Sequence, residues 1–311
     1  MEFSHLPVMP NECMNALRIR PDGVYVDGTL GGGGHSSLIL KNLSENGTLY
    51  AFDKDRDALE FCSEKFRNEK RIHLIHADFK KGAELLRAQG ITEVDGVFLD
   101  LGVSSHQLDT FERGFSYRSR DAKLDMRMDQ SQTKSAYDVV NGYTAEILTE
   151  IFTKYGEEPF AKRIAENILN ERKKHAVETT GQLVNIIDRS IPEAAKIGKG
   201  HCAKRTFQAI RIEVNGELDG LDEAVKNWTD LLRKGGRIAI LTFHSLEDRI
   251  VKQTMKESAT DCICPKNLPV CVCQHKKSIR ILTTKPMLPS EKELNENSRS
   301  ASAKLRAAEK L

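Results

Sequence analysis

The stretch that decides the fold is VYVDGTLGGGGH, at residues 24–35. It begins with β-branched and aromatic residues, which are typical of a buried strand, and this strand closes at Asp27. Gly28 and the glycines at 31–34 then let the backbone approach a ligand closely. A helix is expected to open at His35. A strand, a glycine-rich turn and a helix N-terminus form the first unit of a nucleotide-cofactor fold, with backbone N–H groups facing the ligand.

The composition is that of an ordinary globular protein. The chain has 311 residues, 39% of them hydrophobic, and a formal net charge of +2. This length allows one large domain or two modest ones. Basic residues nevertheless cluster, since residues 172–174 are all basic and His201 is surrounded by Lys196, Lys199, Lys204 and Arg205. Such clusters fit either a phosphate-binding surface or an ordinary solvated helix face.

The termini and the cysteines bear on the location of the protein. The first residues lack the basic leader and apolar core of a signal peptide, and no run approaches the ~18 apolar residues of a membrane span. We therefore expect a cytoplasmic protein. Seven cysteines favour free thiols or a metal site over a disulfide framework. Zinc is one option for Cys262, Cys264, Cys271 and Cys273, but zinc ribbons usually separate their cysteines by two or more residues, so no metal ligand is assigned.

Strands and helices alternate over the first third of the chain. Strand-like runs at 48–52, 72–77 and 94–99 follow the first strand, with helical patterns at 55–66 and 81–89 between them. This predicts an α/β fold with a mostly parallel sheet, in which right-handed crossovers bring the carboxyl ends of the strands to one edge. An acid stands at each of these ends, and we expect all four to line one crevice: Asp27, Asp53, Asp78 and Asp100. Asp27 and Asp78 are equally explained as caps of turns and helices.

The alternation stops after the fourth strand. Residues 110–207 carry helical patterns, such as 145–154 and 159–173, which indicates an inserted all-helical domain. We therefore divide the chain into a discontinuous domain, 1–109 with 208–311, and an insertion, 110–207. In the second part of the discontinuous domain, helices are predicted at 221–232 and 246–256, and strands at 237–243 and 279–282. The polar tail at 290–311 is expected to be mobile unless a ligand orders it.

The cofactor is predicted from what surrounds the glycine stretch. The dinucleotide fingerprint G-x-G-x-x-G fails because its sixth position is a serine, which weakens a nicotinamide interpretation. Asp53 can hold the ribose hydroxyls of a dinucleotide or of S-adenosylmethionine, and Asp78 with Phe79 can pair with and stack on an adenine. Asp100 faces the reacting centre. Several carboxylates around one glycine loop suit a cationic sulfonium better than a pyrophosphate, which they would repel.

Ten motifs occur in one order along nearly the whole chain. They are HLPVM at 5–9, YVDGTLGGGGHS at 25–36, DLGVSS at 100–105, RGFSY at 113–117, LDMRMD at 124–129, YGEE at 155–158, RTFQAIRI at 205–212, VNGEL at 214–218, TFHSLEDRIVK at 242–252 and SAKLR at 302–306. In these motifs the chain resembles the bacterial 16S ribosomal RNA cytosine-N4 methyltransferases. The resemblance implies a class I S-adenosylmethionine-dependent methyltransferase fold, Rossmann-like with an inserted helical domain. It also implies that the cofactor is contacted by Gly33, Gly34, His35, Asp53, Phe79, Asp100 and Gln107.

Methyl transfer to a cytosine N4 amine needs a hydrogen-bond acceptor that draws the amine out of the ring plane, and an eventual proton acceptor. Asp100 is the first candidate, and the segment 101–105 with Ser104 and Ser105 is the second. Asp100 is equally explained as a cofactor ligand only. His244 is placed at the target-base pocket, with capping of the next helix as the alternative. Methylation of cytosine C5 would instead need a thiolate, and we expect burial to explain Cys62.

RNA recognition is expected to rest on basic residues. The substrate-binding candidates are Arg113, Arg127, Lys204, Arg205, Arg299 and Lys304, with Arg306 nearby in the tail. Arg113 and Arg127 are equally explained as a salt-bridge latch between the domains.

The partner that the resemblance implies is 16S ribosomal RNA, methylated at a decoding-region cytidine within the small ribosomal subunit. No membrane partner is expected, and the oligomeric state, including a homodimer, is left open. Three alternatives remain: a DNA or other RNA amine methyltransferase, a nicotinamide oxidoreductase, and a non-catalytic ribosome-assembly factor.

Overall fold

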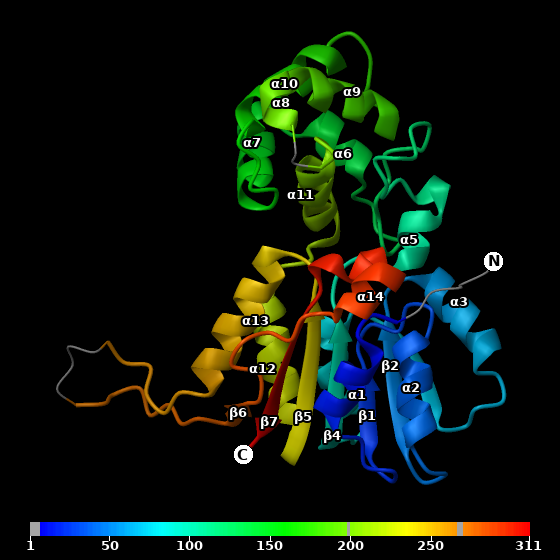
Figure 1. The fold of residues 1–311 in the computed structure, drawn as a ribbon, viewed down its shortest axis with the longest axis vertical. Helices are drawn as coiled ribbons and strands as arrows, with labels where there is room; N and C mark the ends of the chain where they lie inside the picture. The colour runs from blue at the N-terminus through cyan, green and yellow to red at the C-terminus, as the bar shows by residue number, and fades with distance from the viewer. Residues whose placement is uncertain (1–6, 198–199, 266–269) are drawn as a thin grey trace. The chain divides into compact units, whose positions relative to one another are not determined.

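The computed structural model describes residues 7–197, 200–265 and 270–311. Contacts between Cα atoms divide the chain into two compact units, residues 1–102 with 220–311, and residues 103–219. Each unit has its own hydrophobic core. In the described ranges no helix is long and apolar enough to cross a membrane. The first unit carries a sheet and the second is built from helices (Figure 1).

The first unit is organised around a seven-stranded sheet in the order β3-β2-β1-β4-β5-β7-β6. The strands are β1 (Val24–Asp27), β2 (Thr48–Asp53), β3 (Ile72–His76), β4 (Val94–Asp100), β5 (Leu232–Thr242), β6 (Ile279–Ile281) and β7 (Lys304–Lys310). The five strands from β3 to β5 are parallel, and β7 lies antiparallel between β5 and β6. The mostly parallel sheet predicted from the alternation is therefore present.

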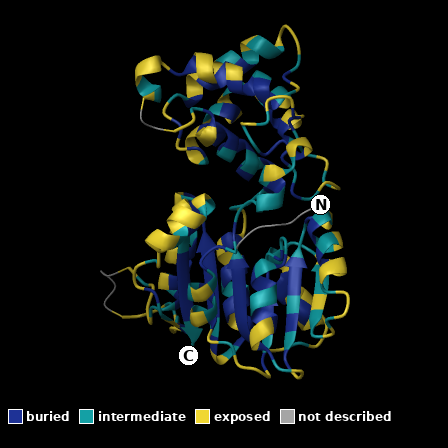
Figure 2. Ribbon diagram, turned by 45° about the vertical axis from the view of Figure 1, so that its right-hand side comes forward, coloured by how far each residue is buried: buried dark blue, intermediate teal, exposed yellow. Residues whose placement is uncertain are grey.

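Helices cover both faces of this sheet. α1 (Pro10–Leu17) packs against α2 (Gly34–Asn42), and α12 (Leu221–Leu231) packs against both α4 (Phe79–Ala88) and α13 (Ser245–Ser258). α3 (Arg56–Lys65) follows β2 and contacts β2 and β3. The central strands β1 and β4 and the second half of β5 are almost entirely buried, in dark blue in Figure 2, whereas the edge strand β3 is only partly covered. Burial on both faces is what a parallel sheet requires, and it explains the continuous apolar runs in the sequence.

The C-terminal tail differs from its prediction, because it is part of the fold. α14 (Glu291–Glu296) and the 3₁₀ helix η2 (Ser298–Ser302) lead into β7, which pairs with β5 on one side and β6 on the other. Leu305, Ala307 and Ala308 are buried. Arg306 is also buried, and its Nε lies 2.6 Å from an Asp248 carboxylate oxygen. The sequence of the tail does not show this burial, because Asp248, the partner of Arg306, lies 58 residues earlier in the chain.

The second unit contains only short helices and loops in its described part. Its helices are α5 (Ser105–Asp109), η1 (Phe111–Arg113), α6 (Ala136–Gly142), α7 (Ala145–Lys154), α8 (Ala161–Arg172), α9 (Thr180–Ser190), α10 (Glu193–Lys196) and α11 (Lys204–Asn215). The predicted limits of the insertion, 110 and 207, both fall inside this unit. Residue 207 lies within α11, whose apolar face packs into the helical core through Phe207, Ile210 and Val214. A boundary there would split one helix.

Candidate functional site

The glycine-rich turn after β1 is held in place by Asp27. Asp27 Oδ1 accepts a hydrogen bond from the Thr29 N–H at 3.1 Å, and Oδ2 accepts one from the Ser36 hydroxyl at 2.6 Å. Burial raises the pKa of Asp27 to about 6 in spite of these hydrogen bonds. Asp27 therefore spans the turn and the first turn of α2, which is the capping role weighed for it from the sequence.

The carbonyl groups of the glycine loop face α3. Lys65 Nζ donates to the Gly32 and Gly33 carbonyl oxygens at 2.9 and 3.0 Å. Gly33 is the N-cap of α2 and has a φ of 69°, and a Cβ atom there would lie 2.7 Å from the Phe66 ring. Only glycine fits this combination of left-handed backbone and close packing. Gly34 then begins α2, where the first N–H groups have no acceptor within the helix and can bind a ligand.

Asp53 ends β2 beside the same loop. Its Oδ2 accepts from the Gly31 N–H at 2.8 Å, and its Oδ1 accepts from the Asp55 N–H at 2.8 Å. Burial raises its pKa to about 6, despite both of these hydrogen bonds. Each carboxylate oxygen has a second lone pair, so Asp53 retains acceptor capacity for two neighbouring hydroxyl groups. This is the geometry expected of a ribose ligand at this strand end.

Phe79 begins α4 next to the turn. Its carbonyl oxygen accepts from Trp228 Nε1 at 3.0 Å, which ties the start of α4 to α12. A Cβ atom on Gly28 would lie 3.1 Å from Phe79 Cβ, so the phenyl group stands directly beside the turn. Asp78 is the N-cap of α4 and accepts from the Lys80 N–H at 2.9 Å. The capping alternative for Asp78 therefore matches the structure, while Phe79 is placed to stack on a ligand.

Asp100 ends β4 and differs from the other acids of this edge. Its N–H donates to Thr29 Oγ1 at 2.6 Å, which ties its backbone to the turn. Its Oδ1 atom is buried, and no group in the described part of the chain hydrogen bonds to it. Burial, followed by the charges of Asp27 and Glu247, raises the pKa of Asp100 to about 8. The site therefore holds a carboxyl group whose ionised form no described cation stabilises.

His35 is close to Asp100 and still does not balance it. His35 Nδ1 lies 3.6 Å from Asp100 Oδ2, which is too long for a hydrogen bond. The other ring nitrogen, Nε2, donates to the Val8 carbonyl oxygen at 2.9 Å. Burial lowers the pKa of His35 to about 4, so the ring is neutral and Nδ1 carries no hydrogen. A cation bound here would supply the missing positive charge.

His244 is the N-cap of α13. Its Nδ1 accepts from the Glu247 N–H at 3.4 Å, and its Nε2 lies 3.0 Å from Glu247 Oε1. Glu247 Oε2 in turn accepts from the Phe243 N–H at 2.9 Å. His244 therefore caps α13, as the alternative weighed from the sequence has it. Its buried Nε2 has no hydrogen-bond partner in the described part of the chain, and a contact with the target base stays a prediction.

Ser104, Ser105 and Gln107 lie at the start of the second unit. Ser104 Oγ accepts from the Gln107 N–H at 3.2 Å, and Gln107 Oε1 accepts from the Ser104 N–H at 2.9 Å, which makes a capping box for α5. Ser105 is the first residue of this helix, and Gln107 is buried. Ser104 and Gln107 therefore order the segment that follows Asp100.

The two arginines proposed for substrate binding hold their own loop together. Arg113 is buried, and its Nη2 donates to the Arg127 and Met128 carbonyl oxygens at 2.9 and 3.0 Å. Arg127 pairs with Asp125 at 2.7 Å and also donates to the carbonyl oxygens of residues 130 and 132. Neither guanidinium group is presented as an open phosphate contact. The ion pair is also internal to the second unit and is not a latch between domains.

The basic cluster around His201 is partly exposed. Lys204 and Arg205 begin α11 and are exposed, and Arg205 Nη1 donates to the Glu157 carbonyl oxygen at 3.1 Å. Lys196 pairs with Asp188 and Glu193 at 2.8 and 2.6 Å. Lys199 of the predicted cluster, like His5 and Leu6 of the first motif, lies outside the described residues.

The basic residues of the tail serve mainly in folding. Arg299 lies in η2, which leads into β7. The Lys304 ammonium lies 3.4 Å from an Asp248 oxygen, and Arg306 makes two hydrogen bonds to the same carboxylate. Burial would raise the pKa of Asp248, but these two partners hold it below the usual value. Lys304 and Arg306 therefore share one partner within the fold, but only Arg306 is buried.

Lys65 and Glu247 shape the site and were not singled out from the sequence. Lys65 follows Cys62 by three residues, so the helical period places both on the face of α3 that meets the glycine loop. Glu247 follows His244 by three residues, which is the spacing of a capping box with histidine in place of serine or threonine. Helical spacing could have found Lys65, and a broader capping rule could have found Glu247.

With this geometry in place, the chain can be compared with known proteins. The sequence profile of the MraW methylase family matches residues 2–311. The chain belongs to the MraW methylase family. Relatives named ribosomal RNA small subunit methyltransferase H are 52% identical in Clostridioides difficile, with full coverage of both chains, and 49% identical in Brevibacillus brevis, covering 100% of this chain and 99% of the relative.

Solved structures were compared as well. They include an rRNA methylase from Streptococcus thermophilus, with a TM-score of 0.40 and 12% identity over 97% of this chain and 93% of that chain. A SAM-dependent O-methyltransferase from Thermotoga maritima has a TM-score of 0.43 and 9% identity over 99% of this chain and 67% of that chain. The sheet itself, parallel from β3 to β5 with an antiparallel β7, is the class I methyltransferase arrangement of this family.

The residues at the carboxyl edge fit S-adenosylmethionine, the cofactor of this family. The glycine turn leaves room for close backbone approach, Asp53 retains acceptors for a ribose, and Phe79 offers a ring beside the turn. The buried, unpartnered Asp100 Oδ1 is the feature that a cation would complete. The sequence-based prediction of a sulfonium cofactor is therefore confirmed.

Proposed function

We propose that this protein transfers a methyl group from S-adenosylmethionine to the N4 amine of a cytidine in the decoding region of 16S ribosomal RNA, within the small ribosomal subunit. Two lines support the proposal. The relatives that match over the whole chain are named ribosomal RNA small subunit methyltransferase H, and the carboxyl edge of the sheet presents a carboxyl group suited to an amine. The single observation that carries the chemistry is the buried Asp100 Oδ1, to which no described residue donates a hydrogen bond.

The cofactor site supplies position and charge. Gly33 and Gly34 would bring the N-terminus of α2 to the cofactor, Asp53 would accept from its ribose hydroxyls, and Phe79 would stack on its adenine. When bound, the cofactor supplies an electrophilic methyl group on a positively charged sulfur. The raised pKa of Asp100 means that the empty site favours the protonated carboxyl group at neutral pH. A nearby positive charge favours the carboxylate, so cofactor binding and ionisation of Asp100 support one another.

Asp100 then acts on the amine. The lone pair of a cytosine N4 amine is delocalised into the ring, which makes it a poor nucleophile. A carboxylate that accepts a hydrogen bond from this amine turns it out of the ring plane and localises the lone pair on nitrogen. The same carboxylate is placed to take the proton that the nitrogen releases after methylation. Ser104 and Gln107 order the segment that follows Asp100, and so act as positioning residues.

The cysteines argue for nitrogen rather than carbon as the acceptor. Attack at cytosine C5 requires a thiolate. Cys62 lies under the glycine loop, and burial raises its pKa to about 12. Burial also raises the pKa of Cys13 and of Cys202. These three thiols are protonated at neutral pH and are not nucleophiles. The other four cysteines, between residues 262 and 273, lie on the exposed connection from α13 to β6.

The RNA contacts are assigned to Lys204 and Arg205, because both side chains are exposed at one end of α11. Reversing the charge of both residues, with Lys204→Glu and Arg205→Glu together, should weaken RNA binding at low salt and make its salt dependence less steep. Arg299→Glu is the matched comparison in the tail. An unchanged salt slope in the double variant would contradict this assignment.

The substrate class is tested with radiolabelled S-adenosylmethionine. The purified protein is incubated with small ribosomal subunits, free 16S ribosomal RNA, or DNA, and digested nucleosides are identified by mass spectrometry. We expect label in N4-methylcytidine from the ribosomal substrate. Label in DNA, or in 5-methylcytidine, would overturn the proposal. Subunit binding without methyl transfer would instead indicate an assembly factor.

A further inference from the structure

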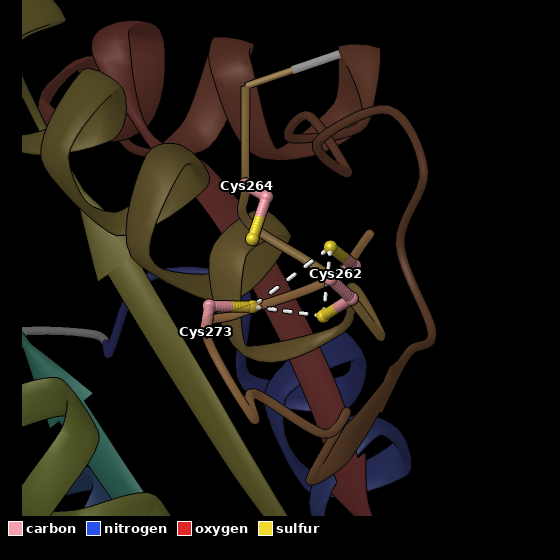
Figure 3. Close-up of side chains that lie close together, drawn as sticks. Cys262, Cys264 and Cys273 are labelled. Carbon is pink, nitrogen blue, oxygen red and sulfur yellow. Dashed lines mark hydrogen bonds between the residues drawn. The ribbon is translucent and has the colours of Figure 1, made fainter. Parts of the chain in front are cut away.

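The connection from α13 to β6, at residues 259–278, contains four of the seven cysteines. They form two Cys-x-Cys pairs, Cys262 with Cys264 and Cys271 with Cys273. Their sulfur atoms all lie within 4.8 Å of one another. In Figure 3 the labelled side chains of Cys262, Cys264 and Cys273 point into one small space. Two segments of the connection that are separated in the chain thus bring their thiols together.

The sulfur spacing matches a tetrahedral metal site. Cys271 Sγ lies 3.4 Å from Cys262 Sγ and 3.6 Å from Cys273 Sγ, and Cys273 Sγ lies 3.8 Å from Cys262 Sγ. A disulfide joins its sulfur atoms at about 2.0 Å, so none is present here. Four thiolates at about 2.3 Å from a zinc ion stand about 3.8 Å apart at the corners of a tetrahedron. The thiols are therefore already close to the positions that a zinc ion would impose.

Backbone groups orient two of the sulfurs from outside. The Val272 N–H donates to Cys264 Sγ at 3.4 Å, and the His275 N–H donates to Cys273 Sγ at 3.5 Å. Such outer hydrogen bonds fix the direction of a metal ligand and offset its negative charge. His275 also anchors the segment to the protein, because its Nε2 lies 3.0 Å from the Glu257 carbonyl oxygen in α13. The cluster therefore has the supporting contacts of a built site.

The connection has no hydrophobic core that could order it. None of its described residues is buried, and Ile263, Val270 and Val272 are 46%, 70% and 71% exposed. A segment of this size that buries no apolar side chains needs a disulfide or a metal to hold one conformation. No disulfide joins the four thiols in this structure, and a metal bound by all four would order the segment.

We propose that Cys262, Cys264, Cys271 and Cys273 bind one Zn²⁺ ion as four thiolates. The four protons of the thiols are released on binding. Four protein ligands fill the tetrahedral coordination shell and leave no open position, so the site is structural and not catalytic. Its role is to fold the connection between α13 and β6. The site is independent of the proposed methyl transfer, and failure of either proposal leaves the other standing.

Metal content is the direct test. Protein purified without chelator, under reducing conditions, is analysed by inductively coupled plasma mass spectrometry. We expect about one zinc per chain in the unaltered protein. The double variant Cys262→Ser with Cys271→Ser, which removes one thiol from each pair, should contain almost none, with circular dichroism confirming that it folds. Cys202→Ser is the matched control, because it removes a partly buried cysteine from the other unit, and it should keep its zinc.

Two further readouts keep the proposal falsifiable. Addition of Co²⁺ to metal-free protein should produce the intense absorption of a tetrahedral thiolate complex, and Zn²⁺ should displace it. Removal of the metal should also accelerate tryptic cleavage at the exposed Lys276 and Lys277 severalfold. Zinc-free unaltered protein that also gives no cobalt spectrum would overturn the proposal. So would stoichiometric iron, or a mass showing that the four thiols are joined in two disulfides.

Discussion

Asp95 and Asp100 stand at opposite ends of β4, and their surroundings differ sharply. Asp95 is 8% exposed, and its oxygens accept from the Val24 N–H at 2.9 Å and from Arg233 Nη1 at 3.0 Å. Asp100 has a neutral histidine at 3.6 Å and a buried oxygen that no described residue contacts. The two acids share a strand and a side-chain chemistry, but among the described residues only Asp95 has hydrogen-bond partners for both carboxylate oxygens.

This difference indicates that the two acids of β4 have different roles. A buried carboxylate without a partner costs free energy, and proteins retain such groups mainly where a ligand completes them. Asp95 fastens the amino edge of the sheet, where β1 and β5 meet it. Asp100 stands at the carboxyl edge, where parallel sheets bind their ligands. The contrast supports the role proposed for Asp100 and makes Asp95 its natural control.

The largest effect is expected when each acid is changed in turn. Asp100→Asn preserves the size of the side chain but removes the negative charge, and it should lower the rate of methyl transfer by about 10²–10⁴-fold. Asp95→Asn should leave the rate nearly unchanged and cost stability instead, by about 1–3 kcal/mol, because Arg233 loses its carboxylate. Single-turnover assays and denaturant titrations measure the two quantities. Similar rates of methyl transfer in the two variants would contradict the different roles given to Asp95 and Asp100.

Asp248 is another buried acid, and its pairing with Arg306 allows a paired carboxylate to be converted into an unpaired one. Arg306→Ala removes its buried partner, and breaking such a pair costs about 3–5 kcal/mol. Lys304→Ala removes a contact that is 38% exposed and should cost at most about 1 kcal/mol. Urea denaturation measures both. Equal stability losses would contradict the internal role given to Arg306, as would a loss of RNA affinity without a loss of stability.

The glycine loop can be tested at matched backbone geometry. Gly33 and Gly90 have φ angles of 69° and 84°, so alanine is strained by about 1–2 kcal/mol at either position. A Cβ atom at 33 would also collide with Phe66, whereas nothing lies within 4 Å of one at 90. Gly33→Ala should therefore weaken cofactor affinity about tenfold or more, while Gly90→Ala should not. Isothermal calorimetry measures the affinity for the cofactor. Equal affinities of the two variants would contradict the placement of the glycine loop in the cofactor site.

The smallest effect concerns pH and stability without cofactor. The pKa of Asp100 is about 8 in the folded protein and about 4 when unfolded, so the folded state holds more protons between these values. Stability should therefore fall as pH rises through this window. Three other buried groups affect the pH dependence of stability mainly below pH 6.5: Asp27 and Asp53, whose pKa values are about 6, and His35, whose pKa is about 4. Asp100 dominates this group from pH 6.5 to 8.

Thermal melts across that range provide the measurement. Asp100→Asn should remove the decline, and at pH 8 it should melt above the unaltered protein by about 2–4 °C for each kcal/mol regained. Asp95→Asn should keep the decline. A parallel decline in both variants would show that Asp100 is not the group responsible.

Local patterns sufficed to predict much of the first unit. The acids at the ends of β1, β2 and β4 follow apolar runs directly, so their common edge could be predicted from order alone. β7 could not be predicted this way, because KLRAAEK becomes a buried strand only when Arg306 meets Asp248, 58 residues earlier in the chain. The same limit applies to Arg113, whose carbonyl partners come from a loop 14 and 15 residues away.

The sequence alone could not show which polar atoms lack a hydrogen-bond partner in the fold, so roles that depend on such atoms could not be predicted. His244 and Asp100 both follow apolar strands, and both were candidates for catalysis. In the structure both residues have a buried atom that no described group hydrogen bonds, His244 Nε2 and Asp100 Oδ1. They differ in that His244 also caps α13 beside Glu247. Likewise the two Cys-x-Cys pairs have an unusual zinc spacing, and only their convergence in space supports a metal site.

The most direct test of the central claim is nucleoside mass spectrometry of 16S ribosomal RNA from cells that lack this protein. The account predicts loss of N4-methylcytidine from the decoding region. The unaltered protein and Asp95→Asn should restore it, and Asp100→Asn should not. An unchanged methylcytidine content in the deleted cells, or full restoration by Asp100→Asn, would contradict the account.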